Sequence, residues 1–149
     1  MSYPSSFFNQ QYLNGEGIRL TSWRMAVVPQ NSPPYSINTD LNIGVSSGVS
    51  KATPGSVYSV YATNANSDIR YLQFFDTSLT PIANTSPILS FLVTSGITSS
   101  PTQILLGTDF FSPNGVAFNY GVAWGISTNE STFMPTSSPS EHTVIVNYV

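Results

Sequence analysis

The sequence predicts a single all-β domain of the sandwich type that follows an extended N-terminal arm. No long stretch has a 3.6-residue periodicity, and short apolar or alternating runs are separated instead by Pro, Gly, Asn and Ser clusters. A chain of 149 residues fits one domain and can bury a stable core without disulfides, which agrees with its lack of cysteine. We place the arm at residues 1–16 and the β-sandwich domain at residues 17–149.

The arm carries three aromatic residues, Phe7, Phe8 and Tyr12. Adjacent phenylalanines on a terminus that frays would expose apolar surface to water. Two arrangements avoid this exposure: the arm folds back onto its own domain, or it reaches a neighbouring subunit. In the second arrangement Phe7, Phe8 and Tyr12 are candidate intersubunit contacts.

The segment after the arm is long enough for one strand, or for two pieces with a bend, over Ile18–Val28. Residues 29–56 contain PQNSPP and SSGVSKATPGS, whose composition is typical of turns. Between these two turns we expect a strand over Ile37–Val45.

Two strands with a turn between them are predicted next. Val57–Thr63 is rich in β-branched and aromatic residues, Asn64–Asp68 is rich in turn formers, and Arg70–Asp76 is again apolar. The pair therefore reads as a hairpin, in which Arg70 could form a surface ion pair with Asp68 or Asp76 worth about 0–1 kcal/mol. On the second strand, Leu72 and Phe74 share one face, and Tyr71, Gln73 and Phe75 share the other.

The remaining strands are predicted at 88–93, near 104–106, at 121–128 and at 142–149, a spacing typical of a sandwich. The last strand is mostly apolar, so it suits the middle of a sheet. The strand around Trp124 has a bulky face and a small face, and another element can pack closely on the small one. The bulky face consists of Val122, Trp124 and Ile126, and the small face of Ala123, Gly125 and Ser127.

Charged residues make up only 7% of the chain and the formal net charge is -3, whereas Ser, Thr, Asn and Gln together make up 56 of 149 residues. A nearly uncharged surface repels its neighbours weakly, which favours a protein held inside a larger assembly. A secreted domain with a Ser/Thr surface is the alternative. Four cations cannot neutralise a run of phosphates, and no apolar run could span a bilayer, so we expect neither nucleic-acid nor membrane partners.

The sequence offers little catalytic chemistry, and we expect no enzyme. His142 is the only histidine, so it would have to be any general base, yet no G-x-S-x-G turn accompanies it. An ordinary polar role at a strand end is the expected one. Oxygen ligands from Asp109 and Asn114 could hold calcium, but no calcium-binding loop motif is present, and we expect no metal or cofactor.

The part of the chain after residue 56 resembles small β-sandwich structural proteins of tailed bacteriophage virions. The similar segments are VYSVYATNANSDIRYLQFFDTS, LTPIANTSPILSFLV, FSPNGVAFNYGVAWGIST and HTVIVNYV, in this order. The resemblance implies structural roles, without catalysis, for matching fold positions. These positions are Arg70, Tyr71, Pro113, Asn114, Gly115 and Trp124.

What the resemblance implies for function is a virion component with a jelly-roll-like sandwich. We expect a capsid decoration or cement protein that bridges neighbouring capsomers, with the major capsid protein and copies of itself as partners in a homotrimer. Its location would then be the virion, assembled in the host cytoplasm. The alternative is a tail-fibre or baseplate module that recognises cell-surface polysaccharide through exposed aromatic residues.

Overall fold

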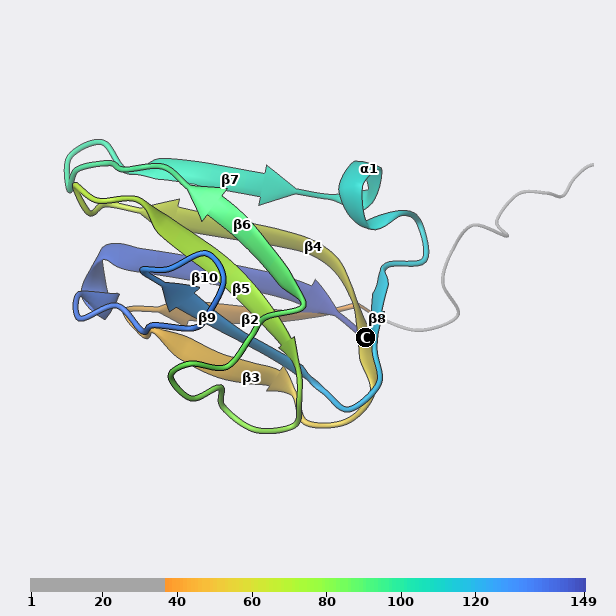
Figure 1. Ribbon diagram of the computed structural model, residues 1–149. Helices are drawn as coiled ribbons and strands as arrows, with labels where there is room; N and C mark the ends of the chain where they lie inside the picture. Colours follow the sequence, from red (N-terminus) through yellow and green to blue (C-terminus); the bar gives the residue numbers. More distant parts are fainter. Residues whose placement is uncertain (1–36) are drawn as a thin grey trace, which may run out of the picture. The chain divides into compact units, whose positions relative to one another are not determined.

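A computed structural model describes residues 37–149, which belong to one compact unit (Figure 1). The predicted arm, the predicted strand Ile18–Val28 and the boundary at residue 17 lie outside the described residues. The elements, labelled as in Figure 1, are β2 (Asn38–Ile43), β3 (Ser47–Lys51), β4 (Gly55–Asn64), β5 (Arg70–Asp76), β6 (Leu89–Val93), β7 (Thr102–Leu106), α1 (Thr108–Phe111), β8 (Val116–Phe118), β9 (Val122–Ser127), the 3-10 turn Pro139–Glu141 and β10 (His142–Tyr148). No helix in this part is long and apolar enough to cross a membrane.

The strands of residues 37–149 form two antiparallel sheets that pack against each other (Figure 1). The five-stranded sheet has the order β2-β10-β4-β7, with β8 paired to the other end of β4, and the four-stranded sheet has the order β3-β9-β5-β6. The pairing is nested: β2 pairs with β10, β3 with β9, β4 with β7 and β5 with β6. This is the arrangement of a jelly roll, so the predicted all-β, jelly-roll-like sandwich is confirmed for these residues.

The core lies between the sheets and is built from the inward-facing residues of both. Trp124 and Phe74 are fully buried at its centre, and the Phe74 ring lies 6.4 Å from that of Phe91 and 6.2 Å from that of Phe118. Burying each large apolar side chain stabilises the fold by about 1.5–3 kcal/mol. The buried core residues are Val57, Val60, Ala62, Leu72, Phe74, Val93, Phe111, Phe118, Val122, Trp124, Ile126, Val144 and Val146.

Several detailed predictions are confirmed. The last strand, β10, lies in the middle of its sheet between β2 and β4. The bulky face of β9 points into the core, and the predicted strand over Ile37–Val45 is β2. The turn at residues 113–115 precedes β8, and it needs glycine because Gly115 has a φ of +75° and an added Cβ would lie 2.8 Å from the carbonyl oxygen of Val57.

The predicted hairpin between Val57–Thr63 and Arg70–Asp76 is wrong. Both strands exist, as β4 and β5, but they lie in opposite sheets, where β4 pairs with β10 and β7 and β5 pairs with β9 and β6. Each turns an apolar face toward the space between the sheets. Packing these faces against each other across the core buries both, which pairing side by side in one sheet would not do.

The predicted turn at SSGVSKATPGS is also partly wrong, because its residues 47–51 form β3. Gly48 lies against the indole of Trp124, where an added Cβ would stand 3.2 Å from the ring. The glycine that suggested a turn therefore serves close packing against a strand remote in the sequence.

The expected surface ion pair of Arg70 does not form. Arg70 shares the inner face of β5 with Leu72 and is only 6% exposed. Its guanidinium donates to the Ile69 carbonyl oxygen at 2.8 Å and to Thr136 Oγ1 at 3.3 Å. The alternation of the strand, rather than the nearest carboxylate, decides where this side chain goes.

Candidate functional site

The two outer faces of the sandwich differ, and the face of the β3-β9-β5-β6 sheet is partly covered by the chain's own loops. Phe133, on the loop after β9, lies over Gly125, and its ring packs edge-on against Phe75 with the centroids 5.5 Å apart. An added Cβ at Gly125 would stand 2.3 Å from the Phe133 ring. The prediction that another element packs closely on the small face of β9 is therefore confirmed.

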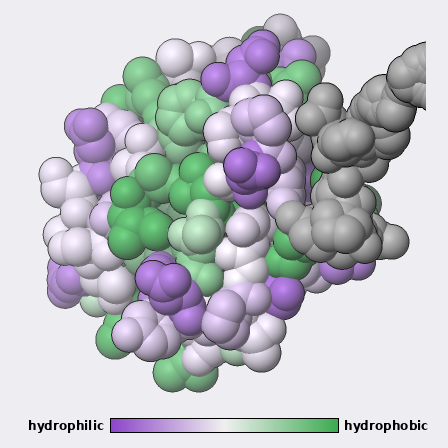
Figure 2. Space-filling view, turned by 90° about the vertical axis from the view of Figure 1, so that its right-hand side faces the viewer, coloured by the Kyte–Doolittle hydropathy of each residue, from purple (hydrophilic) through white to green (hydrophobic). Residues whose placement is uncertain are grey.

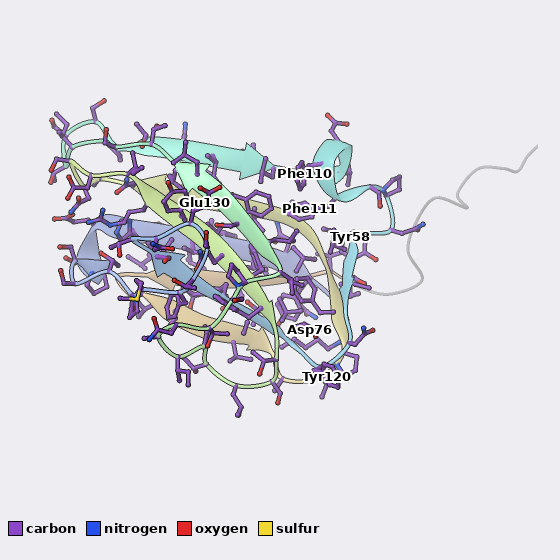
Figure 3. The ribbon with its side chains drawn as sticks, viewed as in Figure 1. Tyr58, Asp76, Phe110, Phe111, Tyr120 and Glu130 are labelled. Carbon is purple, nitrogen blue, oxygen red and sulfur yellow. The ribbon has the colours of Figure 1, made fainter. Side chains whose placement is uncertain are left out.

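Polar contacts hold the same loop on this sheet. Gln73, fully buried on β5, donates to the carbonyl oxygens of Asn129 and Glu130 at 2.8 Å each. Figure 3 marks Glu130 on the loop that runs in front of the sheet. The loop is bonded in turn to the segment after β5, because the backbone N–H of Phe133 donates to Thr85. The loop therefore covers the part of this face over β5 and β9, whereas Leu92 on the outer side of β6 is 48% exposed.

The outer face of the β2-β10-β4-β7 sheet instead carries exposed and half-buried side chains. Its middle row runs across all four strands through Leu41, Ile145, Tyr61 and Leu105, which are aligned by the strand registers. Leu41 is 57% exposed and Leu105 is 74% exposed. We call this surface the open face, and it consists of Thr39, Leu41 and Ile43 of β2, Thr143, Ile145 and Asn147 of β10, Ser59, Tyr61 and Thr63 of β4, and Gln103 and Leu105 of β7.

The polar side chains of the open face bond to one another. Thr39 donates its hydroxyl to Asn147 Oδ1, and Asn147 Nδ2 donates to Ser59 Oγ, both at 2.7 Å. The Tyr61 hydroxyl donates to Gln103 Oε1 at 2.7 Å. Much of the face's hydrogen-bonding capacity is therefore satisfied internally, and these side chains are already ordered before any partner arrives.

No charged side chain lies on the open face. Asp40 belongs to β2 but points between the sheets, where its carboxylate accepts a hydrogen bond from the Ser50 hydroxyl of β3 at 2.5 Å. The face consequently combines an apolar middle row with uncharged flanks, which are polar except for Ile43. Charged residues of the described part stand elsewhere: Asp40, Lys51, Asp68, Arg70, Asp76, Asp109, Glu130 and Glu141.

A second surface feature is the aromatic end of the sandwich, which carries Phe110 and Tyr120 (Figure 3). Figure 2 looks onto this end and shows hydrophobic residues gathered at its middle. Phe110 is 55% exposed although its ring packs edge-on against Phe91 and Phe111, with centroids 5.3 and 5.2 Å away. Tyr120 is 71% exposed.

The backbone beneath Tyr120 is held by a carboxylate. Asp76 Oδ1 accepts hydrogen bonds from the N–H of Tyr120 at 2.6 Å and of Gly121 at 3.3 Å. Desolvation acts to raise the pKa of Asp76, but the hydrogen bonds from residues 119–121 outweigh it, so the net shift is a lowered pKa. The Tyr120 ring thus projects from a fixed loop.

His142 is buried rather than placed in a cleft. It is 2% exposed, its Nδ1 lies 3.3 Å from the Thr63 carbonyl oxygen, and its Nε2 has no hydrogen-bond partner among the described residues. Burial is the main cause that lowers the pKa of His142, and the positive charge of Arg70 lowers it further, against raising effects of Thr63 and Glu141. The expected position at a strand start is confirmed, since His142 opens β10.

Because the folded state keeps His142 neutral, its stability should depend on pH. The unfolded chain binds a proton near the ordinary pKa of 6.5, above the lowered folded value, so stability is fully present above this pH and is lost as the pH falls through the folded pKa. We expect the free energy of unfolding, from urea titrations between about pH 7 and pH 5, to decline in the wild type. The decline should be smaller in His142→Gln, and equal slopes for the two proteins would contradict the prediction.

The other predicted site residues are only partly covered by the structure. Phe7, Phe8 and Tyr12 lie outside the described residues, so their intersubunit role stays a prediction. Asp109 lies in the first turn of α1 and Asn114 is exposed in the turn before β8. Within residues 37–149, no three His, Cys, Asp or Glu side chains come together as a metal-binding group.

The open face was not predicted from the sequence. Its middle row takes one residue from each of four strands that lie far apart in the chain, and their alignment depends on registers that a sequence pattern does not contain. The only signal was the mixed outer side of the last strand, Thr143, Ile145 and Asn147, which is less apolar than its inner side. In a strand between two neighbours, such a side indicates a surface that faces solvent or a partner.

The strand pairing defines a jelly-roll sandwich in which a loop covers part of one outer sheet face and the other outer face is open. The chain matches no protein-family model, no curated protein and no solved structure.

Proposed function

We propose that this chain is a non-catalytic structural protein of a phage virion, a capsid decoration or cement protein that bridges neighbouring capsomers. Its partners are the major capsid protein and copies of itself, arranged as a homotrimer on the shell, and Phe7, Phe8 and Tyr12 of its arm contact neighbouring subunits. The observation that carries the proposal is the open face, an ordered and uncharged surface with an apolar row across its middle.

The chemistry of this face fits permanent packing against protein. Interface cores are depleted in charged residues, and exposed apolar rows on a folded domain mark contact sites. The charged fraction of 7% extends this character to the whole chain. Jelly rolls occur both in viral shell proteins and in lectins, so the fold alone does not separate shell binding from sugar binding, and the proposal rests on the face.

A test uses virus particles that lack the chain. Adding the purified wild-type protein should restore their resistance to heat, and it should co-sediment with the shells. We expect Leu105→Asp, which places a charge in the apolar row at a 74% exposed position, to reduce shell binding at least tenfold, because burying an unpaired carboxylate costs more than about 1.4 kcal/mol.

The matched control is Leu79→Asp, because Leu79 is 71% exposed in the loop after β5 and lies away from the open face. It should bind shells like the wild type. Equal binding of Leu105→Asp and wild type would contradict the role of the face, and absence of the chain from intact particles would contradict the proposed function itself.

The aromatic end supports a second candidate, a tail-fibre or baseplate module that binds polysaccharide. Tyr120 is exposed on a loop fixed by Asp76, and rigid exposed aromatic rings can stack on sugars. Saturable binding on a glycan array that is lost in both Tyr120→Ala and Phe110→Ala, together with no shell binding, would favour this candidate over the first.

A further inference from the structure

We infer that the open face binds the open face of a second copy of this chain, in a two-fold, face-to-face contact. The inference rests on the proposed structural role and names the partner of one of its surfaces. In a shell, this contact would join subunits of neighbouring oligomers, and it is separate from the contact that forms the trimer.

Charge is the first reason for a self-contact. A two-fold contact places a surface against itself, so any charge on it meets its own like charge. The open face has none, since Asp40 points inward to Ser50 and the other charged residues of the described part stand outside the face. A partner of strong charge would find nothing to pair with here.

The position of the apolar row is the second reason. Leu41, Ile145, Tyr61 and Leu105 form the middle of three rows, and the rows on either side are polar except for Ile43 at one corner. Two directions are possible for a two-fold axis that lies in the plane of the face and crosses the middle row: parallel to the strands or parallel to the row. Either axis places the middle row of one copy against the middle row of the other. The apolar centres then coincide, and the flanks, which are uncharged and mostly polar, form the rim.

The internal hydrogen bonds of the face argue against a sugar in this place. Asn147 and Tyr61, which could grip sugar hydroxyls, are already bonded to Ser59, Thr39 and Gln103. A protein surface of the same kind needs few new hydrogen bonds, and the ordered side chains lose little entropy when it docks.

The size of the face sets the strength of the contact. Strands about 4.8 Å apart and rows about 6.7 Å apart give the four-stranded face a plan area of roughly 400 Å², about half of the roughly 800 Å² per partner of a stable complex. The free protein should therefore associate weakly, with a mass that doubles as its concentration rises. On a shell, where copies are held close together, the same weak contact becomes effective.

Cysteine cross-linking of the full chain tests the inference, because the wild type contains no cysteine. An axis along the strands places Leu41 of one copy over Leu105 of the other, so the double variant with Leu41→Cys and Leu105→Cys should form disulfide-linked dimers. An axis along the row brings like residues together, so each single variant should cross-link. The control Leu79→Cys should not cross-link at the same concentration, and dimer yield should fall in urea.

Sedimentation equilibrium gives the second measurement. We expect Leu41→Asp and Leu105→Asp each to raise the concentration at which the mass doubles at least tenfold, with Leu79→Asp unchanged. Both variants are at exposed positions on the outermost strands of the sheet within residues 37–149, and circular dichroism will verify their folding. The inference is overturned if no cysteine on the open face cross-links, or if the aspartate variants associate like the wild type. It is also overturned if the wild-type protein does not self-associate but binds a glycan, and Tyr61→Ala abolishes that glycan binding. If Leu105→Asp loses shell binding but the wild-type protein does not self-associate, the inference is overturned while the proposed function stands.

Discussion

Replacing Gly125 with alanine is expected to destabilise the protein by about 1–3 kcal/mol and to displace the loop that covers the outer side of β5 and β9. The new Cβ would stand 2.3 Å from the Phe133 ring. That ring cannot simply swing away, because its residue is 1% exposed and its backbone is bonded to Asn84 and Thr85. Urea unfolding followed by circular dichroism would measure the change.

A double-mutant cycle separates this clash from a general effect of alanine. Phe133→Ala should cost about 3–5 kcal/mol, as for other buried phenylalanines. In that background Gly125→Ala should cost almost nothing, since the ring it strikes is gone. Gly107→Ala is the matched control because its added Cβ has no atom within 4 Å and its φ of -117° suits any residue. Equal costs of Gly125→Ala with and without Phe133 would contradict the clash.

The sequence predicted those features of the fold that depend on one strand at a time. Alternation around Trp124 showed which side of β9 enters the core and which side accepts a close neighbour, and the apolar character of the last strand placed it inside a sheet. These are local patterns with a period of two, and the structure confirms them.

The features that the sequence did not predict depend on pairing between remote segments. The nested pairing of a jelly roll sends β4 and β5 to opposite sheets, so the nearest strand, which suggested a hairpin for this pair, is the wrong partner. The same reason hid the open face, whose middle row joins Leu41 to Leu105 through strands from both ends of the described part. Arg70 became a buried residue because alternation placed it inward.

The crossover from β4 to β5 depends on one buried amide, and changing it should have the other large effect. Asn64 is fully buried, and its Nδ2 donates to the carbonyl oxygens of Asp68 at 2.9 Å, Thr94 at 3.0 Å and Val93 at 3.3 Å. One side chain thus ties the loop after β4 to the end of β6. An aspartate of the same shape would replace this donor by an oxygen that faces three acceptors.

Asn64→Asp is therefore expected to lose about 3 kcal/mol or more at neutral pH. One oxygen of the buried carboxylate keeps the backbone N–H of Asn66 as its donor, but the other faces three carbonyl acceptors, which is strongly destabilising. Burial and the carbonyl dipoles would raise the pKa of the new carboxyl group in the folded state above its unfolded value. The folded variant then binds the proton more tightly than the unfolded variant does. The amount by which its free energy of unfolding falls below that of the wild type should therefore shrink as the pH falls and grow as the pH rises through the raised pKa.

Urea titrations of variant and wild type at about pH 7 and pH 5 would measure the difference between their free energies of unfolding. Asn64 lies opposite His142 in the register of β4 and β10, so both proteins should also carry His142→Gln, which removes the contribution of that histidine. Asn114→Asp adds the same charge at an exposed turn position and should change stability by less than about 0.5 kcal/mol. A deficit of Asn64→Asp that is the same at both pH values would show that the amide acts by shape alone, and would contradict its role as the donor that joins the two sheets at this end.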